Sequence, residues 1–262
     1  MRNSIVFMVS LLVLIPLLNA CKKVIKLELN TATPQIVIEG NIYDQPGPYV
    51  VKIFKSVNFD QSSIYPPVTG ATVIIRDSSG HSDQLTENQP GSYLTSMTTG
   101  MPGESYSLSV TTTDGQSYTA NSTMPDPVSI GKIYFQNSLI GHNIYPGITF
   151  ADPANISNYY RLVLFLNNVR QPDMNVTDDR LSEGKTITYL IRLRDTDIKL
   201  ITGDLVAIWL ESVDKGVYEY FRTAGREGGQ SASPANPTSN ISNGALGYFN
   251  ACSVRSLSSK VP

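Results

Sequence analysis

Few side chains in this sequence are of the kinds that perform catalysis or hold metals. The chain has two cysteines, Cys21 and Cys252, and two histidines, His81 and His142. A tetrahedral zinc site draws mainly on cysteine and histidine ligands, so this set could not complete one without carboxylates. If Cys21 is consumed by the reaction described below, Cys252 has no partner and no disulfide forms. We therefore predict no metal site and no cofactor.

The same cysteines and histidines give little indication of catalytic activity. Both His81 and His142 fall in predicted loops, and neither lies near a Gly-x-Ser-x-Gly motif. Cys252 lies in an apolar stretch and is predicted to be a buried small side chain, because a reactive thiolate needs a neighbouring base or positive charge. A carboxylate pair acting on glycosidic bonds is left open, since the spatial separation of Asp and Glu residues is hidden in a sequence. We predict that the chain is not an enzyme.

Cys21 carries the clearest chemical signal. Arg2 precedes an apolar run, Ile5–Leu18, which has the length of a signal-peptide core and is short for a membrane span. The run ends in Leu18-Asn19-Ala20-Cys21, which resembles a bacterial lipobox. In such signals the cysteine thiol receives diacylglycerol, the chain is cut before it, and the new amine is usually acylated. We predict a lipoprotein signal peptide over residues 1–20 and lipidation, with a palmitate-type acyl chain, at Cys21.

Residues 21–34 are predicted to form a lipidated tether. In lipoproteins an Asp after the cysteine commonly signals retention in the inner membrane. Lys22 stands there instead, so the outer membrane is the predicted location. Surface-exported lipoproteins often carry acidic residues after the cysteine, whereas this chain has Lys22 and Lys23. The periplasmic and the external face of that membrane therefore both stay open.

Composition narrows the class of protein. The 262 residues include 20 Lys and Arg against 22 Asp and Glu, a formal net charge of −2. A balance so near neutrality argues against nucleic acid as a partner. Charged residues make up 16%, against about 25% in an average protein, which is typical of an exported β-rich chain. The length favours two domains of ordinary size.

Hydrophobic periodicity predicts an all-β fold of two antiparallel β-sandwich domains in tandem. About seven short strands with period-two alternation and turn signals between them predict an immunoglobulin- or transthyretin-like sandwich over residues 35–125. Tyr93, Tyr106 and Tyr118 alternate with polar residues in these strands, so we expect packing with hydroxyls at the rim. The segment Thr123–Pro127 contains two prolines and is the predicted boundary.

A second β-rich sandwich is predicted over residues 128–256. Its most apolar stretch, Tyr159–Leu166, is predicted to be a strand buried on both faces, and 204–211 a second core strand. Asp214 can cap the one short helix, predicted at about 213–224. The last strand is predicted at 247–254.

Three polar loops of the second half are candidates for a ligand surface: Asn137–Asn143, Asp173–Glu183 and Arg226–Asn240. They are long and rich in adaptable side chains, as functional loops tend to be, although variable surface explains them equally well. The acidic residues of 173–183 offer oxygen ligands, so calcium binding there is an open alternative. Solvated acidic loops are commoner, and the spacing matches no EF-hand.

Several short motifs carry resemblances. Residues 68–73 (VTGATV), 90–93 (PGSY) and 103–108 (GESYSL) resemble the transthyretin-like or carboxypeptidase-regulatory β-sandwich. Over nearly the whole chain, a further set of motifs resembles a family of Bacteroidota outer-membrane lipoproteins classed as a domain of unknown function. These motifs are 36–40 (IVIEG), 68–73 (VTGATV), 113–118 (TDGQSY), 159–161 (YYR), 202–204 (TGD), 218–221 (YEYF) and 243–249 (NGALGYF). Members are commonly encoded beside TonB-dependent receptors.

That resemblance implies an accessory or binding lipoprotein at an outer-membrane nutrient transporter, with the receptor barrel as partner. It supplies no catalytic residues. A structural or adhesive cell-surface lipoprotein is the alternative, and a hydrolase is less favoured than either.

Overall fold

The computed structural model describes residues 33–58, 64–138, 143–172, 174–193, 198–225 and 236–262. Within them, Pro34–Pro262 form one compact unit. The predicted signal peptide, Cys21 and all but the last two residues of the predicted tether lie outside the described residues. Along the described ranges, no helix is long and apolar enough to cross a membrane.

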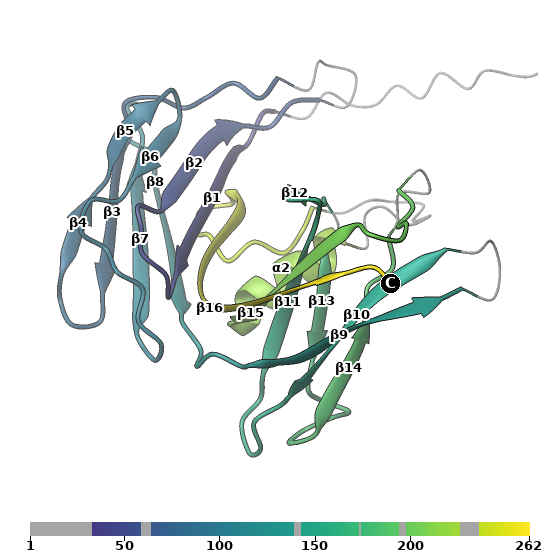
Figure 1. Cartoon of the computed structure of the whole chain (residues 1–262). Coiled ribbons are helices and arrows are strands. Elements are labelled where there is room, and N and C mark those ends of the chain that lie inside the picture. The colour runs from purple at the N-terminus through teal and green to yellow at the C-terminus, as the bar shows by residue number, and fades with distance from the viewer. Residues whose placement is uncertain (1–32, 59–63, 139–142, 173, 194–197, 226–235) are drawn as a thin grey trace, which may run out of the picture. The chain divides into compact units, whose positions relative to one another are not determined.

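Three β-sheets and one helix make up the described part of the chain (Figure 1). The largest sheet contains β1 (Ile36–Tyr43), β2 (Val50–Lys55), β5 (Thr86–Gln89), β6 (Ser92–Leu94), β11 (Tyr159–Leu166), β12 (Val169–Arg170), β13 (Asn175–Asp178), β15 (Leu205–Val213) and β16 (Leu246–Lys260). A four-stranded sheet contains β3 (Thr72–Asp77), β4 (Ser82–Gln84), β7 (Ser105–Thr111) and β8 (Ser117–Thr123). A three-stranded sheet contains β9 (Ile130–Asn137), β10 (Ile144–Ala151) and β14 (Thr186–Leu190). The helix is α2 (Lys215–Ala224).

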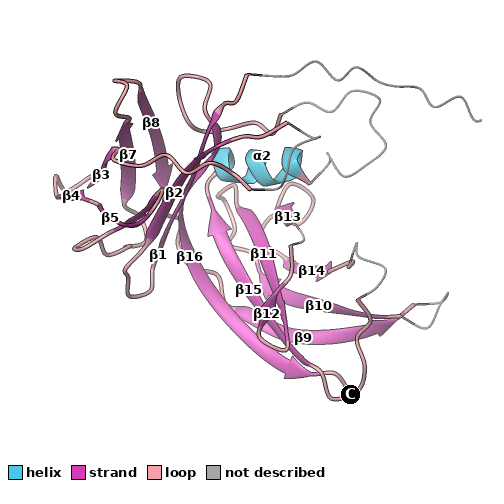
Figure 2. Ribbon diagram, turned by 90° about the horizontal axis from the view of Figure 1, so that it is seen from above, coloured by secondary structure: helices cyan, strands magenta, loops and turns pink. Residues whose placement is uncertain are grey.

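The prediction of an all-β fold with one short helix is confirmed. The helix predicted at about 213–224 begins at Lys215 because Asp214 caps it, its carboxylate accepting a hydrogen bond from the Val217 main-chain N–H at 2.9 Å. Val217 and Phe221, four residues apart, face the protein and are buried. Figure 2 shows α2 beside the large sheet, where it contacts β11, β13 and β16.

One hydrophobic core lies between the four-stranded sheet and the β1–β2–β6 part of the large sheet. In β7 every second residue is buried, so Tyr106, Leu108 and Val110 face this core while the serines between them face outward. Tyr93 is also buried, and its hydroxyl donates to the Val68 carbonyl at 2.9 Å. The tyrosines of this half therefore pack as predicted, with polar tips at the rim.

A second core lies between the three-stranded sheet and the β11–β15 part of the large sheet. Residues Tyr160–Leu164 are buried without a break, which confirms the predicted strand with two covered faces. One face of β11 packs in the second core and the other contacts α2, so both faces are covered. The strand is also central in its sheet, because β15 pairs with one edge and β12 and β13 pair with the other. Alternate side chains then face either the second core or α2.

The long C-terminal strand β16 belongs to both halves. Its first residues pair in parallel with β1, from Val37 beside Leu246 to Tyr43 beside Cys252. Its later residues pair antiparallel with β15 as far as Lys260. The predicted end of this strand at residue 254 is wrong, because β15 offers a partner for six residues more. The parallel pairing was not expected either.

The predicted boundary, Thr123–Pro127, runs from the last residue of β8 towards β9, where the chain passes from the four-stranded to the three-stranded sheet. The large sheet, in the order β12-β11-β15-β16-β1-β2-β6-β5, runs through both halves. The division into domains 35–125 and 128–256 stays a prediction.

Candidate functional site

The structure describes only some of the predicted site residues. His142, residues 139–142 of the first candidate loop and residues 226–235 of the third lie outside the described ranges, as does Asp173. The loop predicted at 173–183 is not simply an exposed loop. It contains β13, which pairs with β11, and the residue after β13, Asp179, is buried.

A buried ion pair lies at the centre of the large sheet. Arg161 of β11 and Glu211 of β15 stand directly opposite each other, and Nη1 donates to Oε2 at 2.9 Å. Their side chains are only 5% and 1% exposed. The guanidinium carbon lies 3.8 Å from the ring centroid of Phe221 on α2. Burial disfavours the charge of Arg161, yet the Glu211 carboxylate outweighs burial and raises the pKa of the arginine.

Aromatic rings of α2 and β16 surround this ion pair. The ring centroids of Phe221 and Tyr248 are 4.7 Å apart, and those of Tyr220 and Tyr248 are 4.9 Å apart. The Tyr248 hydroxyl accepts a hydrogen bond from Asn41 Nδ2 at 3.3 Å. Burial raises the pKa of Tyr220 to about 12, so its hydroxyl keeps its proton at neutral pH.

These groups border a cleft of about 330 Å³ beside α2, which we call the α2 cleft. Its lining consists of Glu39, Arg161, Arg170, Gln171, Pro172, Met174, Tyr220, Phe221 and Tyr248. Burial raises the pKa of the Glu39 carboxyl, and this effect outweighs the nearby lysine and arginine charges, which lower it. Aromatic faces with charged and amide groups at one end suit a ligand that has both an apolar and a polar side.

Of the three predicted ligand loops, one reaches this cleft. Met174, from the described part of the 173–183 segment, lies on its rim, next to residues 170–172. The described residues of the other two loops do not line it. Arg161, Glu211 and Glu39 were not among the predicted site residues. The sequence did hold a signal for Arg161, because it is a charged residue inside an otherwise apolar strand. Burying a charge costs free energy unless the charge is paired or binds a ligand.

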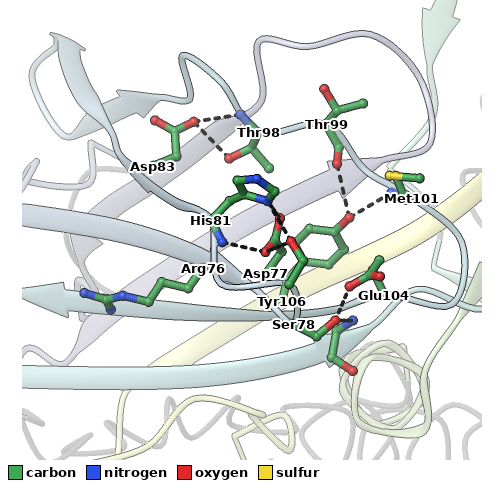
Figure 3. A network of polar contacts seen from close by, with 12 residues as sticks. Arg76, Asp77, Ser78, His81, Asp83, Thr98, Thr99, Met101, Glu104 and Tyr106 are labelled. Atoms are coloured by element: carbon green, nitrogen blue, oxygen red, sulfur yellow. Dashed lines mark hydrogen bonds and ion pairs between the residues drawn. The ribbon is translucent and has the colours of Figure 1, made fainter.

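A second cavity, of about 300 Å³, is lined by residues of β3, β4 and β7 and of the loop after β6. Figure 3 shows polar contacts among several of these residues. Asp83 borders the cavity and is 3% exposed. Its carboxylate accepts hydrogen bonds from the main chain of Ser96, Met97 and Thr98 and from the hydroxyls of Ser96 and Thr98, at 2.8–3.0 Å. Asp83 therefore anchors the loop that follows β6.

The pKa of Asp83 makes this anchor dependent on pH. Burial works against its charge, but the hydrogen bonds from residues 96–98 outweigh burial and lower the pKa from 3.8 to about 2. The stabilisation is therefore complete above pH 4 and is lost as pH falls towards 2; a shift of this size corresponds to about 2 kcal/mol.

We expect Asp83→Asn to lower the free energy of unfolding by about 2 kcal/mol at pH 7 and by less at pH 3, where the wild-type carboxylate loses its advantage. Urea unfolding at the two pH values measures this. Asp126→Asn, at an exposed aspartate, serves as the control. An Asp83→Asn protein that equals the wild type at pH 7 would contradict the anchoring role.

His81 stands near a serine and an aspartate at the mouth of this cavity, but the geometry is not that of a catalytic triad. Its Nδ1 lies 2.6 Å from Ser79 Oγ and 3.1 Å from Asp77 Oδ2 (Figure 3 shows Asp77 and His81). A triad uses Nδ1 for the carboxylate and Nε2 for the nucleophile, whereas one nitrogen serves both here. The His81 side chain is also 87% exposed.

Cys252 is fully buried, as predicted for a structural thiol. Burial raises its pKa well above the ordinary value, which disfavours the reactive thiolate.

A family model described as a domain of unknown function, DUF4249, matches residues 22–258. The chain belongs to the DUF4249 family. The match begins just after Cys21 and includes every residue of the α2 cleft, so the cleft is part of the DUF4249 domain.

No curated protein matches the chain. Among solved structures, similarity was found to a pullulanase from Anoxybacillus sp. LM18-11, at 13% identity and a TM-score of 0.19, and to the same enzyme complexed with maltotriose, at 12% identity and a TM-score of 0.19. In both cases the match covers 66% of this chain and 24% of the other. At this TM-score the similarity says nothing about the activity of the DUF4249 chain.

Proposed function

We propose that this DUF4249 protein is a lipid-anchored accessory protein of the outer membrane, which binds a partner and catalyses no reaction. The observation that carries the proposal is the Leu18-Asn19-Ala20-Cys21 stretch after an apolar run, followed by a folded unit that begins at Pro34. Residues 21–33 would span at most about 45 Å if fully extended. That length tethers a folded domain close to a bilayer.

The state of the two cysteines supports the anchor. Cys252 is enclosed in the protein beneath α2, with its thiol 3.3 Å from Asn250 Nδ2. It is therefore inaccessible to a modifying enzyme in the folded protein. Cys21 is the other cysteine of the sequence and lies in the segment that precedes the folded unit.

The α2 cleft supports a binding role. Its charged groups are held by the fold, since Arg161 is fixed by both Glu211 and Phe221. The rim of the cleft is accessible to a partner, because three of its residues are exposed to solvent: Arg170, Pro172 and Met174. We propose a TonB-dependent receptor barrel as this partner, on the family resemblance carried by the sequence motifs.

Co-purification from gently solubilised outer membranes tests the function. We expect tagged wild-type protein to recover a TonB-dependent barrel, and Arg170→Glu, which reverses a charge on the cleft rim, to recover less of it. Lys132→Glu, at an exposed position of β9, is the matched control and should recover the wild-type amount. Recovery of the wild-type protein without any barrel would contradict the proposal, and recovery of copies of itself alone would favour the structural or adhesive alternative.

A further inference from the structure

Three carboxylates meet at a place apart from the α2 cleft. Asp152 follows β10, Asp179 follows β13 and Glu183 precedes β14. Each offers an oxygen, and the three oxygens lie within 4.8 Å of one another. Asp152 and Asp179 are 6% and 2% exposed, whereas Glu183 is exposed and leaves one side open to solvent.

No ion pair recorded for the described residues involves any of these three carboxylates. The nearby Arg180 pairs instead with Asp178, at 2.8 Å. Two buried carboxylates without a counter-charge are costly, because ions leave water at a large penalty unless they are paired.

The carboxylates do accept some hydrogen bonds. Asp152 accepts from the Tyr160 hydroxyl at 2.5 Å and from the Gly184 N–H at 2.9 Å. Asp179 accepts from the Asn158 N–H at 2.5 Å. These donors are neutral, so they orient the carboxylate oxygens but do not balance their charge.

The amide oxygen of Asn158 is a second, independent observation that bears on these carboxylates. The Asn158 residue is 8% exposed, and its Oδ1 is buried without a hydrogen-bond partner. Buried polar atoms are almost always partnered, so this oxygen is available to an ion or a water molecule.

Strand register places this amide on the side of the carboxylates. The Asp179 N–H donates to the Asn158 carbonyl at 3.3 Å, which extends the β11–β13 pairing by one residue. Residues opposite each other on paired strands project their side chains to the same face, so Asn158 projects beside Asp179. Tyr160, two residues along β11, projects to that face too, and its hydroxyl reaches Asp152. By this register we infer that the buried Asn158 amide lies on the same side as the three carboxylates.

We propose that Asp152, Asp179, Glu183 and the Asn158 amide oxygen form a calcium site. Ca²⁺ binds carboxylate and amide oxygens at about 2.4 Å, so two oxygens on one ion stand at most about 4.8 Å apart, as they do here. Zn²⁺ favours nitrogen and sulfur, which this set lacks. Water would complete the coordination on the open side, at Glu183. The ion would join β10 and β14 of the small sheet to β11 and β13 of the large one.

Calorimetric titration of the full lipidated chain in detergent with CaCl₂, after treatment with EDTA, tests the site. We expect one Ca²⁺ per chain, a rise of several degrees in Tm with Ca²⁺, and at least tenfold weaker binding of Mg²⁺, which demands a tighter octahedral shell. If the wild-type protein shows neither a heat of Ca²⁺ binding nor a change in Tm with Ca²⁺, the proposal is overturned. The three carboxylates would then share a proton instead of an ion.

Two neighbouring aspartates provide matched variants. Asp179→Asn removes one charge from the cluster, so its Tm in EDTA should equal or exceed that of the wild type, while its Tm response to Ca²⁺ disappears. The rise or retention of Tm in EDTA shows that the variant folds. Asp178→Asn, whose carboxylate pairs with Arg180 and the Tyr218 hydroxyl, should keep the Ca²⁺ response. An Asp179→Asn protein that keeps the wild-type response would overturn the assignment.

Discussion

Replacing Arg161 with methionine is expected to lower the free energy of unfolding by about 3–5 kcal/mol, one of the largest effects of any single substitution in this chain. The substitution would leave the Glu211 carboxylate, which is only 1% exposed, buried and charged without its partner. The ring of Phe221 would also lose the guanidinium stacked 3.8 Å from its centroid. Urea unfolding monitored by the fluorescence of Trp209, which neighbours Leu210 and Glu211 on β15, measures the loss.

The double variant Arg161→Met/Glu211→Leu separates the ion pair from its packing. Because both charges leave together, it should recover most of the stability that the single variant loses. Arg180→Met, at an exposed arginine, serves as the control and should change stability by less than about 1 kcal/mol. A single variant Arg161→Met that stays within about 1 kcal/mol of the wild type would contradict the account of a desolvated pair.

Gly247→Ala is expected to destabilise the protein by more than about 3 kcal/mol or to prevent folding. Gly247 has a φ of +97°, and a Cβ at this position would overlap the main-chain carbonyl of Ile38 on the neighbouring strand β1. The backbone conformation costs about 1–3 kcal/mol for any other residue, and the overlap adds to it. Because this contact lies in the parallel β1–β16 pairing, the variant tests the strand that links the two halves.

Gly244→Ala is the matched control for this variant. Gly244 has a similar positive φ of +71°, but a Cβ there would meet nothing within 4 Å. It should therefore show the backbone cost alone, about 1–2 kcal/mol. Thermal unfolding of both variants, followed by circular dichroism, gives the comparison. If both substitutions lower Tm equally, a Cβ at Gly247 does not clash with the Ile38 carbonyl, and β1 and β16 lie farther apart there.

Local features of the fold could be predicted from the sequence because they depend on neighbours along the chain. Asp214 followed by Val217 and Phe221 indicated the helix, since a cap and a stripe of apolar residues suffice to define one. The unbroken apolar stretch Tyr159–Leu166 indicated a strand covered on both faces. Alternation placed Tyr93 and Tyr106 in the core.

Features that join distant segments could not be predicted in this way. The parallel pairing of β1 with β16 brings Val37 beside Leu246, and no local pattern specifies such a register. The partner of Arg161 is fifty positions away in Glu211, so the sequence showed a charge in an apolar strand without showing what balances it.

The acidic segment shows the same limit. Among its described aspartates, Asp178 pairs with Arg180, whereas Asp179 is buried. The pairing of β13 with β11 sets these two orientations. Asp152, which completes the cluster, comes from the end of β10 and lies well before the segment.

The measurement that tests the central claim most directly is metabolic labelling of the full chain with an alkyne fatty acid, followed by fractionation of membranes. We expect label and membrane attachment for the wild type and for Cys252→Ala, because that thiol is enclosed in the fold. We expect the loss of both for Cys21→Ala. A Cys21→Ala protein that still takes up the label, or that remains firmly bound to membranes, would contradict the lipid anchor.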